Sequence, residues 1–449
     1  MKQRISYLIK LFLAFLLFFV LQKIVFVYLN EPLPAGDLFQ VIVHGLGLDA
    51  STTGYLLIFP FLVVWLSIWM RRMKTKAVLR PYFILIAILL SLICVADTSL
   101  YTFWKFKLDA TIFNYMDAPK QAMASVSTGY VVMRLFWITI FSVLLSWTCI
   151  RFTPKTFPAL PINQKMLFHN FTYVLLGGLI FLAIRGGVGR STMNIGNAYF
   201  SENTYMNHAA VNPAFSLMYS WHKSENFAEK YNYLDEHKRA ACYAPLYPAS
   251  TEDCTRQLLR ATNILIIILE GFGGEYIEEL GGAKNVSPNI SRLIREGIFF
   301  DNVYANSFRT DRGLVSTLSG HISYPTTSIM KLPAKSRLLP GIARTLQQAG
   351  YQTDFLYGGD INFTNMRSYF TTTGYQHLTS DTDFSLQERT SSSWGAHDEY
   401  TFDRLYEMLE SRPADRLWHT GFLTLSSHEP FEVPYNRLKD KRQNSFAYT

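Results

Sequence analysis

The sequence predicts an N-terminal bundle of about five transmembrane helices, followed by an α/β domain with a mostly parallel sheet. Two observations lead to this fold class. Leu, Phe, Ile and Val dominate residues 1–190, where they form apolar runs long enough to cross a bilayer. Residues 190–449 have the mixed composition of a globular domain, and strand patterns alternate there with helix patterns. We therefore divide the chain into a transmembrane domain (1–185), a linker (186–261) and a catalytic domain (262–449).

Five apolar segments are predicted to span the membrane, because each approaches the roughly 20 residues that a crossing needs. They are Ile5–Tyr28, Thr53–Met70, Tyr82–Phe103, Tyr130–Ile150 and Met166–Ile184. The first is too long, and too soon followed by further spans, to be a cleaved signal peptide. The apolar patch Leu38–Leu48 has two interpretations: a short interfacial or re-entrant helix, or ordinary core packing.

The distribution of Lys and Arg predicts which side of the membrane each loop faces. Lys2 and Arg4 precede the first span, and the loop after the fourth span is also basic. The most basic loop follows the second span and contains Arg71, Arg72, Lys74, Lys76 and Arg80. Because basic loops stay cytoplasmic, the N-terminus is predicted inside and the chain after about Arg185 outside. Three lysines of the third loop run against this rule: Lys105, Lys107 and Lys120.

The formal net charge of +8 does not indicate a nucleic-acid partner. Many Lys and Arg residues flank apolar runs, where they specify topology instead of forming a stripe along a groove. The cysteines show no metal-ligand spacing, and Cys94 and Cys149 fall in apolar segments. Cys242 and Cys254 follow the last span, where a disulfide and two free thiols both fit the sequence.

The linker begins with the glycine-rich segment Arg185–Arg190. The aromatic and polar residues of Asn203–Lys238 predict short helices near the membrane surface. Beyond the linker, Asn263–Leu269 predicts a strand buried on both faces, because it is a continuous apolar run rich in β-branched residues. Further strands are predicted at Phe299–Tyr304, Gln352–Tyr357 and Leu417–Leu425. Helices are predicted at Pro288–Glu296, Leu338–Ala349 and His397–Leu409.

Polar residues follow several of these strands, at the sheet edge where α/β proteins bind ligands. Glu270 follows the first strand, and Thr310 lies at a turn into a helix after the second. Asp360 and His428 follow two later strands. A carboxylate can hold a divalent cation, and a hydroxyl at a helix N-terminus can become a nucleophile when its pKa is lowered. Four polar clusters at one sheet edge favour an active site.

Each residue also has an ordinary structural interpretation. Glu270 can be a turn carboxylate, and Thr310 can be the N-cap of its helix, with Asp311 in the first turn. A single histidine such as His428 is more often structural than functional. The position of each residue, taken alone, does not decide between these readings.

At these residues the sequence resembles the lipoteichoic acid synthase type of membrane phosphoglycerol transferases, within the sulfatase and alkaline phosphatase superfamily. The segments that carry the resemblance are Ile268–Gly271, Arg309–Asp311, Tyr357–Asp360 and Leu425–Phe431. The five-span membrane part agrees with it as well, so the resemblance covers essentially the whole chain.

The resemblance implies a manganese-type divalent cation held by Glu270, and a threonine nucleophile, Thr310, that also contacts the metal. It implies a membrane phospholipid donor whose headgroup, phosphoglycerol or phosphoethanolamine, passes through a phospho-threonine intermediate to an envelope glycan or glycolipid acceptor. His428, Arg367 and Asp360 are the implied substrate contacts. The implied location is the bacterial inner (cytoplasmic) membrane, with the catalytic domain extracytoplasmic.

The family completes its metal site with an Asp-His pair after a later strand, and no Asp-His dipeptide occurs in this sequence. We therefore expect an incomplete copy of a longer protein, inactive as it stands. Two alternatives to a transferase are a sulfuric ester or phosphoester hydrolase of the same superfamily and a non-catalytic membrane scaffold. Sulfatases need Cys or Ser in a Cys/Ser-x-Pro-x-Arg motif, and the segment from Thr310 to Gly313 has neither that residue nor the proline.

Overall fold

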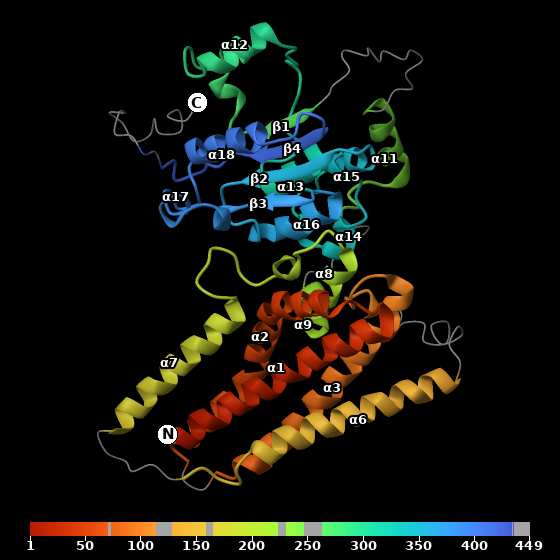
Figure 1. Cartoon of the computed structure of the whole chain (residues 1–449), viewed down its shortest axis with the longest axis vertical. Helices are drawn as coiled ribbons and strands as arrows, with labels where there is room; N and C mark the ends of the chain where they lie inside the picture. The colour runs from red at the N-terminus through yellow and green to blue at the C-terminus, as the bar shows by residue number, and fades with distance from the viewer. Residues whose placement is uncertain are drawn as a thin grey trace.

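The computed structural model describes residues 1–70, 73–113, 128–158, 165–222, 230–246, 263–432 and 434. Figure 1 shows long helices at one end of the molecule and a sheet with shorter helices at the other. The chain is a multi-pass membrane protein, since five of the described helices are long and apolar enough to span a bilayer. They are α1 (Lys2–Asn30), α2 (Ala35–Leu66), α3 (Thr75–Trp104), α6 (Thr128–Phe152) and α7 (Lys165–Arg185).

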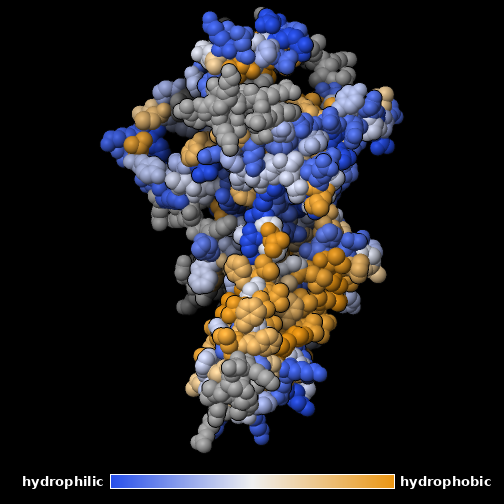
Figure 2. Space-filling view, turned by 90° about the vertical axis from the view of Figure 1, so that its left-hand side faces the viewer, coloured by the Kyte–Doolittle hydropathy of each residue, from blue (hydrophilic) through white to orange (hydrophobic). Residues whose placement is uncertain are grey.

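The five predicted spans are confirmed, and one detail of the prediction is wrong. The patch Leu38–Leu48 is not a separate interfacial or re-entrant helix, because it forms the N-terminal half of α2 without interruption. Val41 and Leu48 are fully buried there, so the interpretation as core packing holds. Figure 2 shows the outer surface of the bundle as an apolar band with hydrophilic surfaces beyond it on both sides.

The N-terminus lies at the end of the bundle farthest from the sheet, as five crossings require (Figure 1). The two described lysines that ran against the charge rule are both neutralised by carboxylates. Lys105 pairs with Glu31 at 3.2 Å, and Lys107 pairs with Asp97 at 2.5 Å. Lys120, Arg71 and Arg72 lie outside the described residues.

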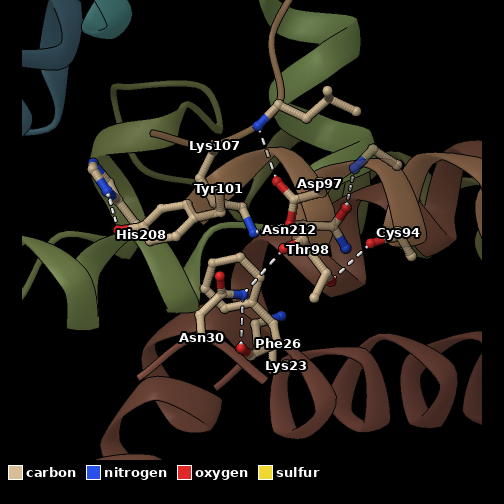
Figure 3. Close-up of polar contacts among 12 residues, drawn as sticks. Lys23, Phe26, Asn30, Cys94, Asp97, Thr98, Tyr101, Lys107, His208 and Asn212 are labelled. Atoms are coloured by element: carbon tan, nitrogen blue, oxygen red, sulfur yellow. Dashed lines mark hydrogen bonds and ion pairs between the residues drawn. The ribbon is translucent and has the colours of Figure 1, made fainter. Parts of the chain in front are cut away.

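A buried charge network joins the bundle to the segments that follow it; it consists of Lys23, Asp49, Asp97, Lys107 and Asn212 (Figure 3). Lys23 Nζ lies 2.6 Å from Asp49 Oδ2, and neither side chain is exposed. Asn212 donates its Nδ2 hydrogen to Asp49 Oδ1 at 2.9 Å. A Cβ atom on Gly45 would lie 2.3 Å from Lys23 Cε, so only glycine permits this approach of α1 to α2.

The second half of the network folds the loop after α3 back onto the bundle. Asp97 accepts hydrogen bonds from Lys107 Nζ and, at 2.9 Å, from the backbone N–H of Leu108. Lys107 Nζ also lies 4.0 Å from the ring centroid of Phe26, a cation–π contact (Figure 3). Each buried charge therefore has an opposite charge beside it, which offsets part of the large cost of removing it from water.

The linker forms short helices, as predicted, and α8 is buried. The described elements are η1 (Ile195–Ala198), α8 (Thr204–Ala210), α9 (Pro213–His222), α11 (Glu236–Tyr243) and η2 (Ala244–Leu246). Ala209 and Ala210 of α8 are fully buried, and Figure 1 shows α8 and α9 between the bundle and the sheet. Cys242 is exposed and has a free thiol, whereas Cys254 lies outside the described residues.

Two side chains fix the ends of the linker. Asn212 Oδ1 accepts hydrogen bonds from the backbone N–H groups of Ala214 and Phe215, so it caps α9 while its Nδ2 holds Asp49. Burial, followed by the nearby charges of Lys107 and Arg337, lowers the pKa of His208 in α8 to about 3. This imidazole therefore stays neutral, and its Nδ1 lies 3.0 Å from the Tyr101 hydroxyl.

The described sheet has four parallel strands in the order β1-β4-β2-β3. They are β1 (Ile264–Ile268), β2 (Gln352–Tyr357), β3 (His377–Thr379) and β4 (Trp418–Leu423). Leu423 pairs with Ile268 on one side and with Tyr357 on the other, so β1, β2 and β4 end at the same level. This register brings the segments after the three strands to one edge of the sheet.

Helices cover both faces of the sheet, as expected for an α/β fold. α13 (Thr310–Ser319), α15 (Ile342–Gln348) and α16 (Met366–Thr373) pack on one face around Phe355 and Leu423. α18 (Asp398–Glu410) packs on the other face around Leu356 and Phe422. The alternation of side chains along β2 and β4 thus supplies two apolar cores. The remaining described elements are α12 (Pro288–Glu296), α14 (Pro333–Ser336), α17 (Leu386–Arg389), η3 (Gly274–Tyr276), η4 (Glu278–Leu280), η5 (Ile329–Lys331), η6 (Phe363–Asn365) and η7 (Asp381–Asp383).

Two strand predictions are corrected by the structure. Residues 299–304 form no strand, because no described strand lies beside them to complete a ladder of hydrogen bonds, and Phe300 and Tyr304 are exposed. The β1 strand exists, but it is not buried on both faces. It is the outermost described strand on its side, and Leu265 and Ile267 remain about 40% exposed.

We predict that Asp49→Asn destabilises the protein because it leaves the Lys23 ammonium buried without an opposite charge. A loss of about 3 kcal/mol is expected for a broken buried pair. The double variant Lys23→Met with Asp49→Asn removes both charges and keeps an acceptor for Asn212, so it should recover much of that loss. Thermal unfolding of the detergent-solubilised protein measures this, and equal melting temperatures for the single and double variants would contradict it.

Candidate active site

The hydroxyl of Thr310 points at a carboxylate, not at its own helix. Thr310 is the first residue of α13, and the N-cap position is Arg309. The alternative in which Thr310 is only an N-cap is therefore wrong. Its Oγ1 donates to Glu270 and lies 2.9 Å from Oε2 and 3.1 Å from Oε1. The position at a helix N-terminus places Thr310 in the positive end of the helix dipole, which favours a negatively charged oxygen there.

Glu270 is held by the segment that follows β4. Its backbone N–H donates to Thr424 Oγ1 at 2.8 Å. Gly271 has a φ of +63°, and a Cβ atom there would lie 2.5 Å from the carbonyl oxygen of Ser427. Glycine is therefore required for the turn after Glu270 to pass this loop. Burial raises the pKa of Glu270, and this effect exceeds the opposite effects of the Thr310 hydrogen bond and the His428 charge.

His428 reaches the same place from the end of β4, and Asp398 positions its loop. The Asp398 carboxylate accepts hydrogen bonds from the backbone N–H groups of Leu425 at 2.7 Å and Ser426 at 3.0 Å. The ring centroids of Trp394 and His428 lie 4.2 Å apart. His428 Nδ1 lies 2.8 Å from the carbonyl oxygen of Glu429, which can only accept, so Nδ1 carries a proton.

Asp398 and Trp394 are the two residues of this arrangement that the sequence analysis did not single out. Asp398 lies one residue inside the predicted helix His397–Leu409, at a position where an acidic residue is usually explained by the helix dipole. Its two backbone hydrogen bonds join segments 27 and 28 residues apart, and no sequence pattern signals a pairing of that kind.

A cavity of about 710 Å³ opens beside Thr310 and is rich in positive charge. Arg309, Arg312 and Lys331 line it together with His222 and His428, and Asp311 is the one acidic residue among the described lining residues. The Asp311 carboxylate pairs with Lys331 at 3.0 Å. Since its cationic side chains outnumber its carboxylates, the cavity suits an anionic group such as a phosphate ester. His222 ends α9, so the linker forms one wall of the cavity.

The structure places Asp360 and Arg367 at the docking surface between the linker and the sheet. Asp360 accepts hydrogen bonds from the backbone N–H groups of Ser191 and Asn362, both at 3.0 Å. Arg367 Nε donates to Asn362 Oδ1 at 2.9 Å. Neither residue is among the described residues that line the cavity beside Thr310. Their role as substrate contacts stays a prediction, whereas Thr310, Glu270 and His428 do lie together.

The donor set of the site suits part of a hard-cation site. The Glu270 carboxylate and the Thr310 hydroxyl present adjacent oxygen atoms, which Mg²⁺ and Mn²⁺ prefer. Within the described part of the chain, no three His, Cys, Asp or Glu side chains converge on one point. Glu270 and Thr310 would therefore supply two ligands of a larger set.

We predict that Glu270→Gln stabilises the metal-free protein increasingly as the pH rises. Because the pKa of Glu270 is raised in the fold, its protonated form stabilises the fold below the ordinary value of 4.5, and this contribution is lost as the pH rises through the raised pKa. Glutamine imitates the protonated form at every pH. In the presence of a chelator, the melting temperature of the variant should exceed that of the parent by roughly 2 °C near neutral pH.

The exposed Glu275→Gln is the matched control for this measurement. A difference between Glu270→Gln and the parent that is constant with pH would contradict the assignment of the effect to Glu270 ionisation.

Part of the chain is similar to known proteins. The Sulfatase family matches residues 262–449. Over 180 residues the chain is 25% identical to the "Lipoteichoic acid synthase-like YvgJ" protein of Bacillus subtilis (strain 168). The match covers 39% of this chain and 28% of the relative. The chain therefore spans less than a third of the relative's length.

The chain is also similar to solved structures. A protein in the alkaline phosphatase superfamily from Vibrio parahaemolyticus has 28% identity and a TM-score of 0.38, over 42% of this chain and 47% of that chain. The lipoteichoic acid synthase LtaP from Listeria monocytogenes has 17% identity and a TM-score of 0.37, over 41% and 48%. The lipooligosaccharide phosphoethanolamine transferase A from Neisseria meningitidis, an integral membrane protein, has 14% identity and a TM-score of 0.32, over 99% and 74%.

The resemblance on which the sequence analysis relied is thus confirmed. Residues 262–449 carry a domain of the sulfatase family, attached to a multi-pass membrane part in a chain similar to lipoteichoic acid synthase-type proteins.

Proposed function

We propose that this protein is a transferase that moves a phospholipid-derived headgroup, phosphoglycerol or phosphoethanolamine, to an envelope glycan or glycolipid. The observation that carries the proposal is the hydrogen bond from the Thr310 hydroxyl to the Glu270 carboxylate. Thr310 itself lines a cavity whose other lining residues include Arg309, Arg312 and Lys331. A hydroxyl donating to a carboxylate is poised to lose its proton as it attacks an electrophile. The cationic lining favours an anionic electrophile, as a phosphodiester is.

The proposed roles follow from these contacts. Thr310 Oγ1 attacks phosphorus, and Glu270 holds the hydroxyl in place and accepts its hydrogen bond. Arg309 and Arg312 stabilise the negative charge on the phosphoryl oxygens. His428 faces the same cavity and can donate or accept a proton through Nε2, since its Nδ1 is engaged with Glu429. The acceptor hydroxyl then displaces Thr310 and completes the transfer.

We further propose that Glu270 and Thr310 hold a divalent cation, with Mn²⁺ as the expected ion. When bound, such an ion would lower the pKa of the threonine hydroxyl and neutralise charge on phosphoryl oxygens. The raised pKa of Glu270 fits this assignment, because a buried carboxylate that lacks a cation partner is less stable in its charged form.

The proposed location is the bacterial inner (cytoplasmic) membrane, with the sheet on the extracytoplasmic side. The basic residues Lys2, Lys74 and Lys155 lie at the ends of membrane helices on the side of the bundle that carries the N-terminus. On the opposite side Lys105 and Lys107 each pair with a carboxylate, Glu31 and Asp97.

We predict that Thr310→Ala lowers headgroup transfer by about a thousandfold or more in the full-length protein, because the attacking oxygen is gone. Transfer of a radiolabelled headgroup from phosphatidylglycerol or phosphatidylethanolamine in vesicles measures it. Mass spectrometry of the parent should detect a peptide in which Thr310 carries the phosphoglycerol or phosphoethanolamine headgroup. The exposed Thr390→Ala is the control and should keep full activity. Unchanged transfer by Thr310→Ala would overturn the nucleophile assignment.

We also predict the topology from single cysteines in a chain that carries Cys242→Ser and Cys254→Ser. The exposed Lys284→Cys should react with a membrane-impermeant maleimide in intact spheroplasts, whereas the exposed Lys155→Cys should react only after lysis. Labelling of Lys155→Cys before lysis would reverse the proposed orientation.

A further inference from the structure

We infer that a second cavity, next to the one beside Thr310, holds the lipid part of the phospholipid donor, so that the donor reaches Thr310 laterally from the bilayer past α9. This inference rests on the proposed function and adds the path of the substrate. The second cavity has a volume of about 330 Å³. It shares two lining residues with the first cavity, Lys331 and Leu332, so the two cavities adjoin.

The walls of the second cavity come from both parts of the molecule. One wall is the loop after α3, from Phe106 to Thr111, and another is the face of α9 that carries Ser216 and Ser220. The third wall is the segment Lys331–Leu338, which includes α14. The cavity therefore lies where the membrane part meets the sheet part, and Figure 1 shows α9 and α14 in this region.

The chemistry of these walls suits a phosphate ester with an apolar tail. Phe106, Leu332 and Leu338 supply apolar surface, and Lys331 and Lys335 supply positive charge, against the single carboxylate of Asp109. The carboxylate of Asp109 already accepts a hydrogen bond from the backbone N–H of Thr111 at 3.0 Å. A phospholipid whose phosphate lies near Lys331 would place the ester groups of its diacylglycerol part among these residues.

One buried hydroxyl in the wall lacks a partner. Ser216 is only 1% exposed, lines the second cavity, and its Oγ makes no hydrogen bond with any described residue. A buried hydroxyl without a partner is costly, and an ester oxygen of a bound lipid would satisfy it. The neighbouring Ser220 differs, because its Oγ already bonds to Ala110 N at 2.9 Å and Ser216 O at 2.7 Å.

Exposed aromatic rings of α9 and α3 are suited to the membrane surface. Trp221 is 66% exposed and packs against Phe113, with ring centroids 5.6 Å apart. Phe103, at the end of α3, is 73% exposed. Exposed aromatic residues at the end of a transmembrane helix are typical of the membrane–water interface. These rings mark where acyl chains would leave the second cavity for the bilayer.

The walls are also fixed before any lipid binds. Lys107 holds the loop after α3 through Asp97, and Asn212 holds the start of α9 through Asp49. The buried charge network thus positions two of the three walls (Figure 3).

The chemical step assigns each cavity one product. As the bond from Thr310 Oγ1 to phosphorus forms, the bond from phosphorus to the glycerol oxygen of the lipid breaks. The bonding electron pair stays on that oxygen, which takes up the proton released by Thr310. The headgroup remains on Thr310 in the first cavity, and diacylglycerol is left in the second.

The test uses the full-length protein in phosphatidylcholine vesicles that contain phosphatidylglycerol with a diazirine near the glycerol end of one acyl chain. After irradiation, mass spectrometry is expected to find the label on residues 106–111, 216–221 or 331–338. Leu338→Trp fills the second cavity at a side chain that is 70% exposed, so folding should survive, and it should reduce this labelling about tenfold. Leu386→Trp, at a similarly exposed leucine elsewhere, should not.

Labelling confined to bilayer-facing positions of α1, α6 or α7, or labelling unchanged by Leu338→Trp, would overturn the inference. The labelling can also be competed with unlabelled lipids. If a phosphate-free acyl glycolipid reduces it as much as unlabelled phosphatidylglycerol does, the inference is overturned, because the second cavity would then serve the acceptor.

A second measurement separates this inference from the proposed function. Turnover of a water-soluble nitrophenyl diester of glycerol phosphate should survive Leu338→Trp and be lost in Thr310→Ala, whereas transfer from the lipid should fall about tenfold in Leu338→Trp. If neither donor is turned over, the proposed function fails, and the labelling pattern still decides whether lipid occupies the second cavity. If both donors lose activity equally in Leu338→Trp, the inference is wrong.

Discussion

The placement of the proposed catalytic residues depends on two buried ion pairs in the membrane part. Lys23 with Asp49 and Lys107 with Asp97 are charged side chains removed from water, which is tolerable only with an opposite charge at contact distance. Each pair also holds a segment that is not a membrane helix. Asp49 binds Asn212 at the start of α9, and Asp97 binds the loop after α3. The linker therefore has a defined position on the bundle, and the sheet has a defined position on the linker.

The candidate site depends on a second constraint, the common level at which three parallel strands end. Because Leu423 pairs with both Ile268 and Tyr357, the residues that follow β1 and β4 come to one edge. Glu270 and His428 are adjacent for this reason, although 158 positions separate them in the chain. Thr310 completes the cluster because α13 begins beside that edge and packs its apolar side on the sheet. Backbone geometry thus brings the three side chains together. Gly271 permits the turn after Glu270, and Asp398 holds the segment that follows β4.

Much of this could be predicted from the sequence, and the misses share a cause. Membrane spans are visible because a bilayer imposes length and apolarity on one continuous segment. The strand at Gln352–Tyr357 and the helix at Pro288–Glu296 were predicted with their observed bounds, since local pattern and burial agree there. The strand predicted at Phe299–Tyr304 was wrong because a strand needs a neighbour, which a local pattern cannot report. The same holds for Asp398 and Asn212, whose partners are distant in sequence.

Glu270 and His428 come to one edge because the strand ends of a parallel sheet share it, and Thr310 reaches Glu270 from the start of α13. The roles of the three residues stay predictions. The sequence did not predict that Asp360 binds the linker or that Arg367 binds Asn362. The sequence offers no sign that residues near 190 return to the sheet, since that docking uses backbone N–H groups such as that of Ser191, which every residue type carries.

The length of α2 has a consequence for the kind of membrane in which the protein can act. With 32 residues, α2 extends over about 48 Å, whereas the hydrocarbon core of a typical bilayer is about 30 Å thick. Val41 and Leu48, in the N-terminal half of α2, are buried against the linker. This half of the helix therefore supports the linker and fixes the distance of Thr310 from the membrane helices. A change in the thickness of the bilayer's hydrocarbon core moves the lipid headgroups relative to Thr310, because the position of Thr310 on the bundle is fixed. Bilayer thickness is thus a physical variable that changes the distance between the membrane surface and Thr310.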